Sequence, residues 1–289
     1  MSTTFDTNCM KINRATPDSH KYLALLGHIA RPPKALFYSG TLPSERQPTV
    51  AIVGSRKPTQ YGHEVTYTLS YELARRGVII VSGLALGVDG IAHRAALEAG
   101  GTTIAILANG LPTIYPASHK ALGRQIIDQG GAIISEYQPE TPARNYQFLE
   151  RNRIVSGIAD AIIITEAAAR SGTLNTAMHA LEQGKDVFVV PGNITSPMSA
   201  GCNALIKQGA SIVTSATDIL EVVSPDSSHE QSRLPLGDTP EETNIIQLIQ
   251  SGIRDGEELQ RISGIAASTF ATTLTMLELN GSIRALGGN

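Results

Sequence analysis

The sequence predicts an α/β fold, in which a Rossmann-like, doubly wound and mostly parallel sheet is followed by a small C-terminal winged-helix domain. From Thr49 onward, short runs rich in Val, Ile and Ala alternate with helical patterns, which is typical of parallel strands covered on both faces. Glycine-rich turns end the first two runs, at the edge where such sheets bind ligands. The C-terminal end of the chain shows three short helical patterns instead, which predict the winged helix.

The chain begins with a polar lead-in over residues 1–35, in which a helix is expected from His20 to Ile29. Pro32 and Pro33 stop that helix, because proline lacks a backbone N–H and fixes φ. The main domain is expected over residues 36–223, with strands at 50–53, 78–81, 103–108, 132–135, 161–165, 187–190 and 211–213. Its helices are expected to begin after Gly62, Asp89, Ser118, Thr173 and Gly201.

Residues 224–241 have the Ser- and Pro-rich composition of a linker. Beyond it, a winged-helix domain is expected over residues 242–289, with helices at 243–249, 256–262 and 268–279. Asp255 and Glu258 form a capping box at the start of the second of these helices. Residues 281–286 are expected to form the short strand of the wing.

Composition limits the classes of protein that this chain can belong to. With 289 residues, 42% of them hydrophobic, it can form one main domain and a smaller unit. Because it has no long apolar run and a polar N-terminus, we expect a soluble cytoplasmic protein that does not enter a membrane. The two cysteines are far apart, the histidines are scattered and no G-x-x-x-x-G-K-[ST] motif occurs, which predicts no disulfide, metal, cofactor or ATP hydrolysis.

The first glycine turn, V-G-S-R-K, is a candidate anion site. Gly54 lets the backbone come close to a ligand, Ser55 can bond a phosphate oxygen, and Arg56 offers a planar fork for bidentate contact, with Lys57 beside it. The alternative is a tight strand-to-helix turn whose arginine simply faces solvent. The spacing favours anion binding over this alternative.

The second glycine turn adds Ser82, Gly83 and Gly87 to the candidate site. Asp89 is placed at the helix N-cap, and His93 lies one turn later on the same face. Such a pair could serve acid–base chemistry, but no nucleophile is evident nearby. The sequence therefore favours a capping aspartate and a core histidine.

A third group of candidates follows further along the chain. Arg151, Asn152 and Arg153 are expected at the start of a helix, where cations are disfavoured unless they bind an anion such as phosphate; pairing with Glu136 or Glu166 is the alternative. Further candidate contacts are Ser171, Gly172 and Thr173 at the next helix start, and Lys120 at the rim, for which a solvated surface lysine is the alternative. Phe148, Tyr146, Tyr137 and Tyr115 are expected in loops near the strand ends, where aromatic rings can stack on the bases of a single strand; packing in the core is the alternative for Phe148.

Taken in order, the motifs resemble the DNA-processing protein A (DprA/Smf) family from about Leu36 to Val223. They are V-G-S-R-K-P-T, S-G-L-A-L-G-V-D-G-I-A-H, N-G-L-P-T-I-Y-P, S-E-Y, F-L-E-R-N-R-I-V-S-G, S-G-T-L-N-T-A, V-F-V-V-P-G-N and S-A-G-C-N-A-L-I-K-Q-G-A. Leu86 stands where the family usually has arginine, and Pro112 and His119 replace its common aspartate and asparagine. Relatives often have a larger helical domain before this region, for which the lead-in leaves little room.

The resemblance implies a non-enzymatic homodimer that binds single-stranded DNA and loads the RecA recombinase on it during natural transformation and recombination. It also implies that Arg56 contacts DNA. The net charge of -3 opposes a broadly basic DNA-binding surface, so any contact with DNA is expected to be local.

Two rival functions have weaker support. A nucleotide-cleaving phosphoribohydrolase of the LOG type carries a P-G-G-x-G-T turn, whereas this chain has A-R-S-G-T. A winged-helix transcription regulator would need cations on its recognition helix, and residues 268–280 contain neither Lys nor Arg.

Overall fold

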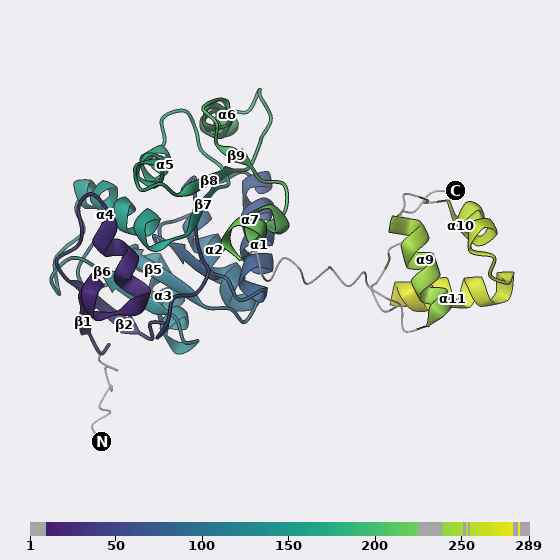
Figure 1. Ribbon diagram of the computed structural model, residues 1–289, viewed down its shortest axis with the longest axis horizontal. Coiled ribbons are helices and arrows are strands. Elements are labelled where there is room, and N and C mark those ends of the chain that lie inside the picture. The colour runs from purple at the N-terminus through teal and green to yellow at the C-terminus, as the bar shows by residue number, and fades with distance from the viewer. Residues whose placement is uncertain (1–9, 225–238, 251–252, 254, 280–282, 284–289) are drawn as a thin grey trace, which may run out of the picture. The chain divides into compact units, whose positions relative to one another are not determined.

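The computed structural model describes residues 10–224, 239–250, 253, 255–279 and 283, in two compact units divided between Pro225 and Asp226. The first unit is built on one nine-stranded sheet in the order β1-β2-β6-β5-β4-β3-β7-β8-β9 (Figure 1). The strands from β6 to β9 in this order pair in parallel, and β1, β2 and β6 pair antiparallel. The predicted doubly wound, mostly parallel sheet is confirmed.

The seven parallel strands lie where the Val- and Ile-rich runs place them. They are β3 (Thr49–Val53), β4 (Ile79–Ser82), β5 (Thr103–Leu107), β6 (Ala132–Ser135), β7 (Ala161–Ile164), β8 (Asp186–Val189) and β9 (Ser211–Ile212). In β3 the side chains alternate between two cores, because successive residues of a strand point to opposite faces. Ala51 and Val53 belong to one core, and Val50 and Ile52 belong to the other.

Helices cover both faces of this sheet (Figure 1). One face packs against α4 (Asn145–Ile158), α5 (Gly172–Glu182) and α6 (Ala200–Lys207). The other packs against α1 (Gln60–Arg75), α2 (Val88–Glu98), α3 (Lys120–Asp128) and α7 (Ala216–Val223). Short 3-10 helices precede α3 at Ala117–His119 and α6 at Pro197–Ser199. Among the described residues, no helix is both long and apolar enough to cross a membrane.

The lead-in is part of the first unit and its core. The strand β1 (Asn13–Ala15) pairs with β2 (Leu36–Gly40), which in turn pairs with β6. The expected helix is 3-10 and covers Lys21–His28, after a first 3-10 turn at Pro17–Ser19. Its Tyr22, Leu23 and Leu26 are fully buried, which explains why this polar segment folds onto the sheet.

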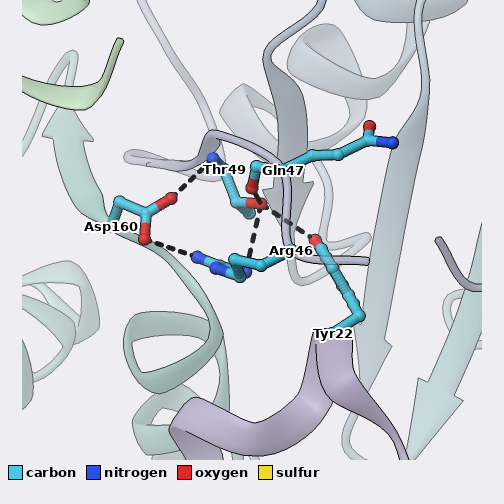
Figure 2. Close-up of polar contacts among 5 residues, drawn as sticks. All are labelled: Tyr22, Arg46, Gln47, Thr49 and Asp160. Carbon is cyan, nitrogen blue, oxygen red and sulfur yellow. Dashed lines mark hydrogen bonds and ion pairs between the residues drawn. The ribbon is translucent and has the colours of Figure 1, made fainter. Parts of the chain in front are cut away.

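A partly buried polar network links the lead-in to the sheet (Figure 2). Tyr22 shares a 3.1 Å hydrogen bond with Thr49 Oγ1, and Thr49 donates its backbone N–H to Asp160 at 2.8 Å. Arg46 closes the network with a 2.6 Å ion pair to Asp160. Burial raises the pKa of Tyr22 to about 12, so this hydroxyl stays protonated. Residues from the lead-in, from β3 and from the turn before β7 are therefore linked.

The second unit contains α9 (Pro240–Gln250), α10 (Gly256–Ser263) and α11 (Ala267–Leu279). The linker was predicted to extend to residue 241, but Pro240 and Glu241 already belong to α9. The Asp255 side chain accepts a 2.9 Å hydrogen bond from the Glu258 N–H, as the capping pattern predicts. Ile245, Leu259 and Phe270 form its small core. The wing predicted at residues 281–286 lies outside the described residues except for Ile283.

Candidate nucleic-acid interface

A cavity of about 310 Å³ lies at the carboxyl ends of the parallel strands, where the strand order reverses between β3 and β7. This is the edge where doubly wound sheets bind ligands. Ten of the fifteen residues predicted from the sequence line it: Gly54, Ser55, Arg56, Gly83, Phe148, Arg151, Asn152, Ser171, Gly172 and Thr173. The first and second glycine turns therefore meet the start of α5 in one place.

The turn after β3 is held by backbone contacts. Ser55 donates its N–H to the Glu166 carbonyl at 2.8 Å, and its own carbonyl accepts the Val88 N–H at 3.0 Å. Gly87 has a φ of +76°, and a Cβ there would lie 2.6 Å from the Arg56 carbonyl oxygen. Gly87 thus allows the two turns to come close and does not line the cavity, and its role as a DNA contact stays a prediction.

The Arg56 side chain extends from this turn into solvent. Its side chain is exposed, and among the described residues it forms no ion pair. The guanidinium carbon lies 5.5 Å from the centre of the Phe148 ring, within the range of a cation–π contact. Phe148 in turn packs on Tyr115, with 5.6 Å between ring centres. The Arg56 guanidinium, which has no ion-pair partner among the described residues, therefore lies beside the ring of Phe148, and Phe148 contacts Tyr115.

The N-terminus of α5 opens onto the same cavity. Ser171 caps this helix by accepting the Thr173 N–H at 3.2 Å, and Thr173 Oγ1 donates to the Gly54 carbonyl at 3.0 Å. Gly172 is exposed, and a Cβ built on it would meet no atom within 4 Å. The positive end of the α5 dipole, at the exposed Gly172, thus lies at the cavity that Arg56 also lines.

Arg151 has a structural position in the cavity wall. It is 5% exposed, and its Nη1 donates to the Ile106 carbonyl at 2.8 Å. The guanidinium packs against Gly83, where any side chain would collide with it. Burial lowers the pKa of Arg151 and raises the pKa of Asp89, and the attraction between the two opposes both shifts. Arg151 is therefore largely committed to the protein.

Asp89 and His93 are held by other contacts than a helix cap. The helix α2 begins at Val88 with Gly87 as N-cap, and Asp89 instead accepts the N–H groups of Gly83 at 3.0 Å and Ala85 at 3.2 Å. His93 is fully buried, with Nδ1 2.7 Å from Thr103 Oγ1. Burial lowers its pKa to about 3. The predicted cap by Asp89 is therefore wrong, because Gly87 is the N-cap and Asp89 lines the cavity, whereas His93 lies in the core, as the sequence favours.

Four other predicted contacts do not line this cavity. Arg153 forms a 2.7 Å ion pair with Glu136, the alternative that the sequence left open, and Ser82 is buried and donates to the Ile52 carbonyl at 2.6 Å. Lys57 is exposed outside the cavity, and Lys120 lines a different one.

The helix α4 starts earlier than the sequence predicts, which changes the setting of several candidates. Gln147 accepts a hydrogen bond from the Arg144 N–H, so the helix begins at Asn145. The three residues 151–153 therefore lie in the helix interior and not at its start, and Tyr146 and Phe148 lie in its first turn and not in a loop. The helix dipole thus gives no reason for anion binding by Arg151 or Arg153.

Sequence reasoning missed Arg170, which lines the cavity, is exposed and forms no ion pair with any residue that the structure describes. Its position in A-R-S-G-T, two residues before α5, is the signal that could have identified it. Leu149 and Met198 add apolar surface to the wall. The cavity therefore combines two unpaired cations, an open helix end and apolar surface.

Glu166 fills the N-terminus of α1, on the other side of the same switch point. Its carboxylate accepts the Thr59 N–H at 2.8 Å and the Thr59 hydroxyl at 2.6 Å, and the residue is 2% exposed. Gly62 is required there, since a Cβ would lie 2.6 Å from the Glu166 carboxylate. This helix end already holds an anionic group of the protein itself. No signal in the sequence predicted this contact.

Comparison with known proteins decides the family. The family model described as DNA recombination-mediator protein A matches residues 13–224, and the DprA winged helix domain matches residues 229–289. The chain belongs to the DprA/Smf family. It is 48% identical to Protein Smf of Escherichia coli over 65% of this chain and 50% of that protein. It is 42% identical to DNA processing protein DprA of Bacillus subtilis, over 73% of this chain and 71% of that protein.

Solved structures of DprA share the fold. The structure from Streptococcus pneumoniae has a TM-score of 0.69 and 38% identity, covering 74% of this chain and 75% of that chain. The structure from Helicobacter pylori has a TM-score of 0.65 and 33% identity, covering 75% of this chain and 97% of that chain. The present DprA family member spans about half the length of its E. coli relative. Leu86 is exposed and does not line the cavity.

Proposed function

We propose that this chain binds single-stranded DNA in the cavity at the β3–β7 switch point, without catalysis, and loads RecA on the bound strand in natural transformation and recombination. The proposal rests on the exposure and the position of the Arg56 side chain. It is exposed, has no anionic partner among the described residues, and lies over Phe148 at the open N-terminus of α5. A phosphate placed there would meet a planar cation together with the positive end of the α5 dipole at the exposed Gly172.

The aromatic rings favour a single strand over a duplex. Tyr115 is 49% exposed and continues the ring contact from Phe148, so unstacked bases have a surface on which to lie. Duplex binding needs a wide basic surface, and this chain has a net charge of -3. Asn152, Ser171, Gly172 and Thr173 complete the wall that we assign to the sugar–phosphate backbone. Gly54, Ser55 and Gly83 shape its floor.

Relatives support the same assignment. The H. pylori structure is described as showing the single-stranded DNA binding mode of that protein, and it is 33% identical to this chain. The family is that of a DNA recombination-mediator protein, which supports transfer of the strand to a recombinase such as RecA. We place this activity in the cytoplasm.

The hydrogen bonds and burial of the acidic and basic groups near the cavity support binding without catalysis. Both Glu166 oxygens are bonded to Thr59, Asp89 is bonded to backbone amides, and His93 is buried and neutral. Glu166 and His93 are therefore not free to move a proton to or from a ligand, whereas Asp89 lines the cavity and is held there by the Gly83 and Ala85 amides. Release of free base from a nucleoside monophosphate by the purified protein would contradict this part of the proposal.

We also propose that the chain forms a homodimer. The strand β9 lies at an edge of the sheet, and Ile212 on it is 51% exposed. Unprotected apolar edge strands favour pairing with another chain. Ile212→Glu should then convert a dimer to a monomer in light scattering, whereas a wild-type chain that is already monomeric would refute the proposal.

We assign the C-terminal winged-helix domain, residues 242–289, a regulatory or protein-binding role, and the main domain, residues 36–223, the DNA. The C-terminal domain is net acidic, and α11 contains neither Lys nor Arg. Such a helix would be repelled by duplex phosphates. Deletion of the residues after Pro240 should leave affinity for single strands nearly unchanged.

The experiment that tests the proposed function is fluorescence anisotropy with a labelled oligothymidine and a duplex of equal length, at two salt concentrations. We expect tighter binding of the single strand, and affinity that falls as salt rises. Equal affinity for both, or no binding of the single strand, would overturn it.

A further inference from the structure

A second cavity of about 590 Å³ lies beside α3, away from the site described above. Lys11, Lys120 and Arg124 line it, and we call these three residues the α3 cation cluster. All three side chains are exposed, and none is in an ion pair with any residue that the structure describes. Asp128 is the one acidic residue of this lining. In a chain of net charge -3, such an excess of unpaired cations in one hollow needs an explanation.

The cluster is drawn from two parts of the fold. Lys11 precedes β1, at one side of the sheet, whereas Lys120 and Arg124 lie four residues apart and hence on the same side of α3. Three like charges line one cavity with a single carboxylate, Asp128, to offset them, so an anionic ligand would relieve the remaining repulsion. The arrangement is therefore suited to a ligand with repeated negative charge.

The loop before α3 connects the two cavities. Tyr115 contacts Phe148, a residue of the first cavity, while its neighbour Ile114 lines the second. Arg56, Phe148 and Tyr115 thus form a continuous series of contacts that leads from the first cavity to the loop beside the α3 cation cluster. A strand whose bases stack on these rings would be directed from one cavity toward the other.

We propose that the α3 cation cluster is a second phosphate-contact zone, which holds the continuation of the same single strand after it leaves the first cavity. This inference rests on the proposed function, because it extends the same DNA path. Strands too short to span both cavities reach only the first. Longer strands gain the second set of phosphate contacts, so affinity depends on length.

The test is the affinity of the full chain for a series of oligothymidines, from about 4 to about 16 nucleotides, measured for wild type and for the double variant Lys120→Ala/Arg124→Ala. Two lost phosphate contacts should lower the salt slope for the longest strands by about 1.4, with on the order of a tenfold loss of affinity. The shortest strands should bind the variant and the wild type equally. The matched control is Lys34→Ala/Arg75→Ala, two exposed cations that line neither cavity, and it should match wild type at every length.

Each other result has a definite meaning. Unchanged affinity at every length, an equal loss for the shortest and longest strands, or an equal loss in the control would overturn the second zone. Those results leave binding in the first cavity intact, which Arg56→Ala reports separately. If wild type binds no oligothymidine of any length, the proposed function and this inference both fail.

Discussion

Two helix N-termini flank the point where the strand order reverses, and they differ in what fills them. The start of α1 is closed by the Glu166 carboxylate, which accepts two hydrogen bonds from Thr59. The start of α5 is capped only by Ser171, with Gly172 exposed. The dipole of α1 thus stabilises the fold by facing a carboxylate of the protein, whereas the dipole of α5 is left for a ligand.

The arginines of the cavity divide in the same way. Arg151 is buried and bonded to a backbone carbonyl, whereas Arg56 is exposed and has no ion pair among the described residues. Identical residue types near one cavity therefore have different tasks. We infer that groups with partners inside the protein set stability and that groups without them set affinity for DNA.

The largest effect on stability is expected for Arg151→Ala. This change leaves a cavity, removes the hydrogen bond to Ile106 and leaves the buried Asp89 without its neighbouring cation, at a cost of about 4 kcal/mol. Urea unfolding should show it as a lower midpoint. Arg56→Ala is the matched control and should stay within about 0.5 kcal/mol of wild type. Equal midpoints for both variants would remove the distinction between the two arginines.

Glu166→Ala should destabilise the closed helix end by about 2 kcal/mol, because the Thr59 N–H and hydroxyl lose their charged acceptor. The folded fraction should still bind single-stranded DNA with wild-type affinity. Glu166→Gln, which keeps an acceptor oxygen, should cost less in the same unfolding assay. A loss of affinity without a loss of stability would mean that Glu166 belongs to the binding site.

Stability should depend on pH through His93. Its pKa is about 3 in the fold and about 6.5 in the unfolded chain, so only the unfolded chain takes up the proton as the pH falls below 6.5. This contribution is fully favourable above pH 6.5 and should be reduced by about 1.4 kcal/mol at pH 5.5. Denaturant unfolding should be measured above pH 6.5 and at pH 5.5. The difference in unfolding free energy between the two conditions should be smaller for His93→Gln than for wild type. An unchanged difference would mean that His93 is not held neutral.

The capping residues allow the two helix ends to be compared directly. Ser171→Ala and Thr59→Ala each remove an N-cap and should each cost about 1 kcal/mol or more of stability. Only Ser171→Ala should also weaken binding of single strands, because only the α5 amides face the cavity. Anisotropy titrations of the two variants measure this difference, and equal losses of affinity would contradict it.

The sequence predicted the sheet well because buried parallel strands carry near-continuous Val and Ile runs between glycine turns. It did not predict β1 or the pairing of the lead-in, since that segment is polar and its few buried residues, such as Tyr22, show no period; it also did not predict β2 (Leu36–Gly40). The turn around Arg56 was predicted correctly because glycine spacing is a local signal.

The role of Arg151 was not predictable in the same way. Whether an arginine faces a ligand or a backbone carbonyl depends on contacts with residues distant in sequence, here Ile106 and Gly83. Glu166 was missed for the same reason, because its partner Thr59 lies 107 residues away. Local patterns identify where a turn lies, and only the fold shows which of its side chains remain free.

The salt dependence of single-strand affinity in Arg56→Ala tests the central claim most directly, with Lys57→Ala as the matched control from the same turn. If the free arginine holds a phosphate, Arg56→Ala lowers affinity and reduces the salt slope by about 0.7, while Lys57→Ala, outside the cavity, stays close to wild type. A folded Arg56→Ala protein with unchanged affinity and slope, or a Lys57→Ala protein with the same loss, would contradict the account.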